Sequence, residues 1–118
     1  MRRMTQVAVL MGMAWLIPGL ALAGGDATKG NDLYHQNCAV CHGAGGKGDG
    51  PGGAALNPQP RDLTDKAYMS ALDDKKLHEA IEKGGQATGK SPLMPPMGAG
   101  LSGQQIDDIV AYIRTLAK

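Results

Sequence analysis

Cys38-Ala39-Val40-Cys41-His42 is the stretch of this sequence that decides how the rest of the chain folds. Cys38 and Cys41 are its only two cysteines. Thiols three residues apart on one helical turn lie on the same side of the backbone, where both can bond to one edge of a porphyrin. His42 follows directly, and imidazole is a good ligand for iron. The spacing therefore predicts one haem c, held by two thioether bonds and an axial nitrogen.

Three alternatives to haem attachment are weaker. A redox disulfide of the thioredoxin type needs a strand-rich βαβ context, and the sequence has no run of residues with the alternation of a strand. A zinc site needs four ligands, and outside the motif only His35 and His78 remain as soft candidates. A chance match is disfavoured by two further properties of the chain, its export signal and its thin core.

The composition also favours a bound cofactor. The chain has 118 residues, which is room for a single domain and excludes multidomain enzymes. It has no Phe, one Trp and three Tyr, so its side chains alone would make a thin core. Small domains of this kind usually depend on a disulfide, a metal or a cofactor, and a Cys38–Cys41 disulfide would close too short a loop to restrain the unfolded chain. We therefore expect haem to fill the centre.

Residues 1–23 have the pattern of a secretory signal peptide. Two arginines precede an apolar run, a Pro-Gly pair interrupts it, and Ala21-Leu22-Ala23 offers small residues at which a signal peptidase can cut. The alternative is an uncleaved anchor, because residues 7–23 approach the length of the shortest membrane-spanning helix. The interruption and the small residues favour cleavage. We expect residues 24–118 to form one domain in the periplasm, with no stable membrane insertion.

The charge of the chain excludes one class of partner. Without residues 1–23, ten basic side chains stand against eleven acidic ones, which is a formal charge of −1. Binding to nucleic acid needs a clustered basic surface that such a chain cannot assemble. Nucleic acid is therefore not expected as a partner.

Three segments have the pattern of helices, residues 27–37, 73–83 and 102–118. Asp26 or Thr28 can cap the first and Asp73 can cap the second, and the last opens with a capping box and repeats apolar residues at helical spacing. Residues 43–60 and 84–100 are rich in Gly and Pro, so they are expected to be long loops. The predicted fold class is all-α with long Gly- and Pro-rich loops.

A six-coordinate iron needs a second axial ligand on the face opposite His42. Residues 91–98 carry two methionines, and the prolines around them reduce the entropy lost when a thioether is held in place. A methionine is nevertheless more often core filler than a ligand. His35 is expected on the same side of the haem as His42, and His78 on the surface. The candidates are Met69, Met94, Met97, His35 and His78.

Several short segments after residue 23 match one known family. They are Gly30, Tyr34, the Cys38–His42 motif, Gly48-Asp49-Gly50-Pro51, Pro60-Arg61-Asp62-Leu63-Thr64-Asp65, Met94-Pro95-Pro96-Met97-Gly98 and the final helix. With these segments, the sequence resembles a class I c-type cytochrome over essentially its whole mature length. The resemblance implies a small cytochrome c fold of three to four helices around one covalently bound haem.

The resemblance also implies roles for single residues. In that family the axial methionine is commonly followed by Pro, then by an aromatic residue two places on and Gly, which places the ligand at Met94. Met97 stands where the family often has Phe, so it remains a second candidate for the iron. The Pro51 carbonyl is expected to accept a hydrogen bond from the other ring nitrogen of His42. Arg61 is expected to pair with a haem propionate, the alternative being a solvated loop cation.

Iron held between His and Met has no open position, so we expect outer-sphere electron transfer and no enzymatic activity. The predicted function is a monomeric periplasmic shuttle that takes one electron from a dehydrogenase or membrane complex. It would pass the electron to a terminal oxidase or reductase, docking these redox partner proteins at the haem edge. A peroxidase or gas-binding protein is the alternative if neither Met94 nor Met97 binds iron. A haem subunit of a larger oxidoreductase is a third hypothesis.

Overall fold

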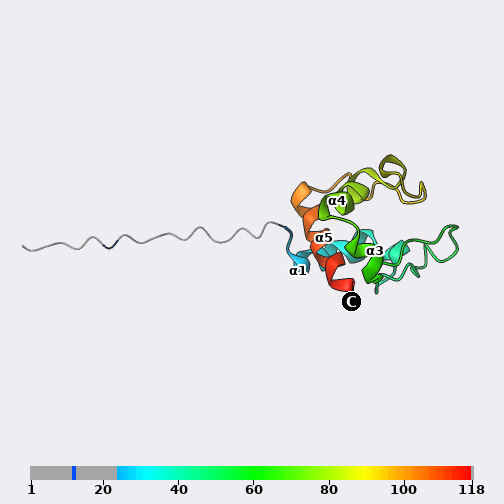
Figure 1. Ribbon diagram of the computed structural model, residues 1–118, viewed down its shortest axis with the longest axis horizontal. Helices are drawn as coiled ribbons and strands as arrows, with labels where there is room; N and C mark the ends of the chain where they lie inside the picture. The colour runs from blue at the N-terminus through cyan, green and yellow to red at the C-terminus, as the bar shows by residue number, and fades with distance from the viewer. Residues whose placement is uncertain (1–11, 13–23, 118) are drawn as a thin grey trace, which may run out of the picture.

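The computed structural model describes Gly12 and residues 24–117, and within these residues the chain is helical with connecting loops. The helices are α1 (Ala27–Asn37), α2 (Ala39–His42), α3 (Lys66–Ser70), α4 (Asp74–Lys83), the 3₁₀ turn η1 (Gln86–Thr88) and α5 (Gly103–Leu116). In Figure 1, α1, α4 and α5 gather around one centre and the two long loops extend on the same side of it. The predicted all-α class with long loops is confirmed.

The predicted signal peptide, residues 1–23, lies outside the described part of the chain except for Gly12. Among the described residues, no helix has both the length and the apolar character needed to cross a bilayer. The boundary expected at residue 24 therefore stays a prediction.

Helices α1 and α5 cross at close range and form the centre of the fold. Helix α1 is capped by Asp26, whose side chain accepts hydrogen bonds from backbone N–H groups of the first turn. Gly30 lets the two backbones meet, because a Cβ at this position would overlap the carbonyl oxygen of Asp108. Tyr34 follows one turn later, is fully buried, and packs its ring against Tyr112 with 5.2 Å between the ring centroids.

The apolar face of α5 supplies more buried apolar residues than any other helix of the described chain. Its start is fixed by the predicted capping box, in which the Ser102 hydroxyl accepts from the Gln105 N–H and the Gln105 side chain accepts from the Ser102 N–H. The buried apolar side chains of this helix are Ile106, Ile109, Val110 and Ile113. The spacing that predicts the helix therefore also predicts its buried face.

In the described part of the chain the helices outnumber the predicted three to four, because two of the five α-helices are single turns. One of them, α3, is capped by Asp65, whose side chain accepts from the Tyr68 N–H at 3.1 Å, and it buries Met69 in the core. A five-residue turn is too short to show a helical period, so the sequence pattern does not reveal it. The turn η1 likewise falls inside the predicted loop 84–100.

Candidate functional site

Helix α2 holds both thiols of the motif on one wall of a cavity. It is a single turn, closed by the N–H of His42 donating to the Cys38 carbonyl at 2.9 Å. Cys38 is buried and Cys41 is half-buried, and both are free cysteines. Burial raises the pKa of Cys38 to about 11, and the neighbouring Cys41 adds to the rise. Before haem attachment, the Cys38 sulfur is therefore a thiol rather than a thiolate at neutral pH.

The glycine-rich loop, residues 43–60, packs against α2 and is hydrogen-bonded to its backbone. Alternate backbone N–H groups of residues 48–52 donate to the carbonyls of residues 42, 41 and 40 in turn, at 2.7, 3.1 and 2.7 Å. A Cβ at Gly50 would overlap the carbonyl oxygens of Ala39 and Val40, so a side chain cannot be accommodated there. The loop is rich in glycine because its backbone must lie directly against the haem-attachment motif.

The second ring nitrogen of His42 has a partner other than the predicted one. Its Nδ1 lies 3.2 Å from the carbonyl oxygen of Arg61. A carbonyl only accepts, so Nδ1 carries the proton and Nε2 keeps the lone pair that a metal needs. In this structure the Arg61 carbonyl takes the place expected for the Pro51 carbonyl, and the role of Pro51 stays a prediction. The backbone on either side of Pro51 is bonded to α2, and the later segment containing Arg61 passes beside the ring instead.

The methionine loop, residues 91–98, forms the opposite wall of the cavity. Two backbone hydrogen bonds attach it to the end of α4. The Gly85 N–H donates to the Met94 carbonyl at 2.9 Å, and the Gly98 N–H donates to the Ile81 carbonyl at 2.8 Å. Three prolines in residues 91–98 restrict the backbone further. Met94 is half-buried and packs against the core cluster, whereas Met97 is 36% exposed. Met94 is therefore the better supported of the two side chains.

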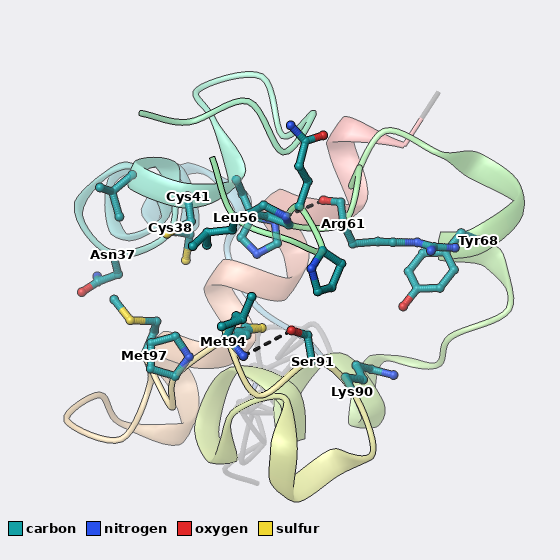
Figure 2. Close-up of a pocket in the computed structure, with 17 residues that line it drawn as sticks. Asn37, Cys38, Cys41, Leu56, Arg61, Tyr68, Lys90, Ser91, Met94 and Met97 are labelled. Atoms are coloured by element: carbon teal, nitrogen blue, oxygen red, sulfur yellow. Dashed lines mark hydrogen bonds between the residues drawn. The ribbon is translucent and has the colours of Figure 1, made fainter. Parts of the chain in front are cut away.

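The two walls enclose a cavity of about 350 Å³. Figure 2 shows Cys38 and Cys41 on one side of it and Met94 and Met97 on the other. The lining between them includes the apolar residues Leu56, Pro58, Pro60, Leu93 and Pro95. Two thiols, the imidazole of His42 and an opposing thioether are the donor set of a covalently attached haem, so these residues fit that group.

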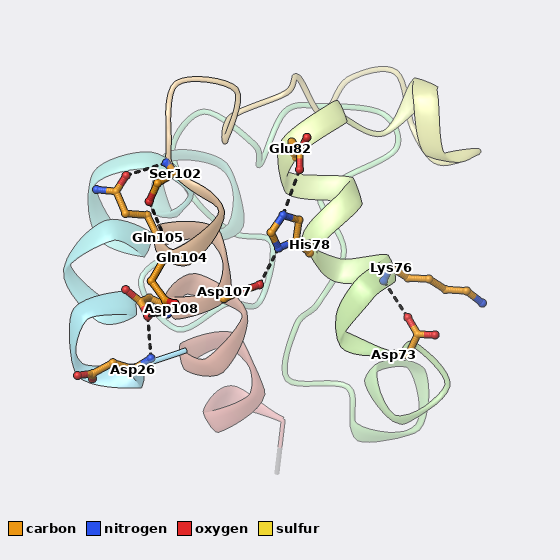
Figure 3. Close-up of polar contacts among 10 residues, drawn as sticks. All are labelled: Asp26, Asp73, Lys76, His78, Glu82, Ser102, Gln104, Gln105, Asp107 and Asp108. Atoms are coloured by element: carbon orange, nitrogen blue, oxygen red, sulfur yellow. Dashed lines mark hydrogen bonds and ion pairs between the residues drawn. The ribbon is translucent and has the colours of Figure 1, made fainter. Parts of the chain in front are cut away.

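The remaining axial candidates are held elsewhere and do not line this cavity. Met69 is 1% exposed, inside the core. His35 is exposed and its ring packs edge-on against Tyr34. His78, expected to be a surface residue, is half-buried instead and bridges two helices: its Nδ1 lies 2.7 Å from Asp107 and its Nε2 3.1 Å from Glu82 (Figure 3). Within the described chain, the thioethers that line the cavity together with His42 are therefore those of Met94 and Met97 in the methionine loop.

Comparison with known proteins gives the site a family. The model of the cytochrome c family matches residues 27–117, from the start of α1 to just past α5. The chain belongs to the cytochrome c family. As a class I c-type cytochrome it has one covalently attached haem c, and its chemistry is haem-based electron transfer.

This cytochrome is similar to small cytochromes and to a segment of larger oxidase subunits. Cytochrome c-554(547) of Halothiobacillus neapolitanus is 36% identical over 94 residues, covering 78% of this chain and 98% of the relative. The cbb3-type cytochrome c oxidase subunit FixP of Bradyrhizobium diazoefficiens is 33% identical over 93 residues, covering 79% of this chain but 28% of FixP. The solved KustC0563 c-type cytochrome superposes with a TM-score of 0.62 at 26% identity, covering 75% of this chain and 98% of that one. The cytochrome c fold is thereby confirmed.

Arg61 contributes both its backbone carbonyl and its side chain to the site of the cytochrome. Besides its carbonyl, its side chain lines the cavity, with the guanidinium carbon 3.7 Å from the centroid of the Tyr68 ring. The pairing of Arg61 with a haem propionate stays a prediction. Lys90 is a second cation on the lining. Sequence reasoning misses Tyr68 and Lys90, because each lies in a segment without a motif of its own.

The burial of His42 predicts how the stability of the cytochrome depends on pH. Burial lowers the pKa of His42 below 6.5, although the hydrogen bond to the Arg61 carbonyl opposes the shift. The unfolded chain therefore binds a proton more readily than the folded chain. We expect the stability contributed by neutral His42 to be fully present above about pH 6.5. It should be lost as the pH falls toward the pKa of His42 in the folded chain. Urea unfolding midpoints measured across this range would test the sign.

A histidine on the surface provides the control for this pH dependence. His35→Gln removes an exposed imidazole, so the unfolding midpoints should keep the same pH profile. Binding of iron by His42 would act in the same direction, because protons and the metal would compete for Nε2. A midpoint that rises on acidification through this range would contradict the assignment.

Proposed function

We propose that this cytochrome is an exported carrier that moves single electrons from a dehydrogenase or membrane complex to a terminal oxidase or reductase. The observation that supports it best is that His42 and Met94 line one cavity, with Cys41, the neighbour of His42, on the wall opposite Met94. When bound, the haem supplies an iron that accepts and releases one electron. The proposed site is Cys38 and Cys41 for attachment, with His42 and Met94 as axial ligands.

The proposed ligands suit a carrier because each is held by backbone contacts. Nδ1 of His42 is occupied by the Arg61 carbonyl, so only Nε2 is free to bind iron. Met94 is fixed by the Gly85 N–H and by its contact with the core. Ligands that stay in place in both oxidation states minimise the rearrangement that accompanies transfer of an electron. Thioether ligation also raises the reduction potential.

The rim of the cavity suits brief contacts with redox partner proteins. Val40, Leu93 and Met97 all line the opening and are 52%, 43% and 36% exposed. Redox encounters use small interfaces, and a chain with a charge near −1 after loss of residues 1–23 attracts partners weakly over distance. We propose a monomer that docks through this rim, exported to the periplasm by the signal peptide at residues 1–23.

Carbon monoxide separates the carrier from a peroxidase or gas-binding protein. With His42 and Met94 both bound to iron, adding carbon monoxide to the reduced protein should leave the absorption spectrum unchanged. A protein with an open axial position should change its spectrum at once. The measurement is a difference spectrum of the purified holoprotein, and an immediate change at neutral pH would overturn the carrier proposal.

A haem subunit of a larger oxidoreductase is the second candidate, favoured by the similarity to FixP. The chain covers 28% of FixP, so the relation concerns one segment of that subunit. Gel filtration of the native extract distinguishes the two functions. A free carrier elutes at the size of a single small domain, whereas a subunit elutes with a large complex.

A further inference from the structure

The hydrogen bond that orients His42 depends on an exposed loop residue. Its acceptor is the backbone carbonyl of Arg61, and the Arg61 side chain is exposed. Exposed loop residues usually leave their carbonyl free to move with the local backbone. A bond that sets the tautomer of an iron ligand therefore needs something that holds this residue in place.

Two contacts hold this segment: the N–H of the buried Leu63 donates to the Gly46 carbonyl at 2.7 Å, and the Arg61 side chain lies on the ring of Tyr68. The guanidinium carbon lies 3.7 Å from the ring centroid, which is well inside the range of a cation–π contact. Tyr68 belongs to α3, seven residues further along the chain, so the contact closes residues 61–68 into a compact loop. Both side chains also line the cavity (Figure 2).

The backbone of Tyr68 is held in place by its neighbours in α3 and by α5. The Asp65 side chain accepts from its backbone N–H at 3.1 Å, and the next residue, Met69, is fully buried. Arg114 of α5 donates from Nη1 to the Met69 carbonyl at 2.6 Å and from Nε to Asp74 at 2.8 Å. The ring is therefore attached to the core, whereas the Arg61 side chain is attached to the ring.

We propose that Tyr68 is a positioning residue for the axial ligand His42, because its ring holds Arg61 and the Arg61 carbonyl holds the His42 Nδ1–H. The inference rests on the proposed role of His42 as an iron ligand. Tyr68 does not have to touch the iron or exchange electrons in this role. It acts by keeping the imidazole in one tautomer and one orientation.

Hydrogen–deuterium exchange of the His42 Nδ1 proton tests this chain of contacts in the reduced holoprotein by NMR. Tyr68→Leu removes the ring, so the hydrogen bond opens more often and we expect exchange about 2- to 5-fold faster, the factor that corresponds to one exposed cation–π contact. Tyr68→Phe keeps the ring and should exchange at the wild-type rate. In an Arg61→Ala background, Tyr68→Leu should add nothing.

Tyr112→Leu is the matched control, because Tyr112 is also a half-buried tyrosine but packs against Tyr34 at the helix crossing. A merely structural role predicts that the variants at 68 and 112 speed the exchange of His42 in proportion to their loss of stability. The proposal predicts a change for Tyr68→Leu alone. It is overturned if Tyr68→Leu exchanges like the wild type, or if Tyr112→Leu has the same effect at equal stability.

The two proposals fail in different ways. If His42 is not an iron ligand, the wild-type protein lacks the NMR signals of a ligated imidazole, and the proposed function fails. If only the role of Tyr68 is wrong, the wild-type spectrum is that of a ligated histidine and the variants do not differ from it in exchange.

Discussion

Replacing Met94 by Ala is expected to abolish the weak sulfur-to-iron absorption band of the oxidised holoprotein. Met94 is the half-buried methionine of the loop, and its carbonyl is fixed by the Gly85 N–H at 2.9 Å. The haem remains attached through Cys38 and Cys41, so the loss is confined to the sixth ligand. The reduction potential should fall, and the reduced variant should bind carbon monoxide. The absorption spectrum of the purified variant is the measurement.

Met97→Ala is the matched control, because it removes a thioether from the same loop and the same cavity lining. Met97 is 36% exposed, and we expect the band to survive its loss. The reverse result, with the band lost in Met97→Ala and kept in Met94→Ala, would assign the iron to Met97. Loss of the band in neither variant would place the sixth ligand outside this loop.

The largest expected effect on stability comes from Gly30→Ala. An added Cβ would overlap the Asp108 carbonyl oxygen, a backbone atom that cannot rotate away. Helices α1 and α5 would have to separate, which loosens the packing of Tyr34 on Tyr112. We expect the free energy of unfolding to fall by about 3 kcal/mol, because this overlap outweighs the gain of about 1 kcal/mol that Ala brings to a helix interior. Urea denaturation of the holoprotein measures the difference.

Gly103→Ala adds the same methyl group to a helix without the crowding. Its Cβ would have a single heavy atom nearby, Cε1 of His78 at 4.0 Å. This variant should be as stable as the wild type or more stable by up to about 1 kcal/mol. Equal stabilities of the Gly30 and Gly103 variants would contradict the close crossing of α1 and α5.

The parts of the fold that the sequence predicts correctly are those with local causes. Asp26 caps α1, Asp73 caps α4, and the box formed by Ser102 and Gln105 starts α5, each through neighbours within three residues. The placement of Cys38 and Cys41 on one wall follows equally from the geometry of one helical turn. These elements need no knowledge of distant contacts.

The parts that the sequence does not predict depend on how distant segments meet. The acceptor for His42 comes from Arg61, nineteen residues away. The bridge between His78 and Asp107 needs α4 and α5 side by side. No local pattern specifies either meeting. The family resemblance marks the segment that contains Arg61 but assigns its role to the charge rather than to the carbonyl.

The attachment of the methionine loop to α4 determines how a ligand could leave. The N–H of Gly85, just after the helix, donates to the Met94 carbonyl of the loop. The N–H of Gly98, at the other side of the loop, donates to the Ile81 carbonyl of α4. Moving the backbone of Met94, the proposed ligand, out of the site therefore requires a subglobal opening that includes the last turn of α4. The frequency of such an opening would be set by the stability of that cooperative unit.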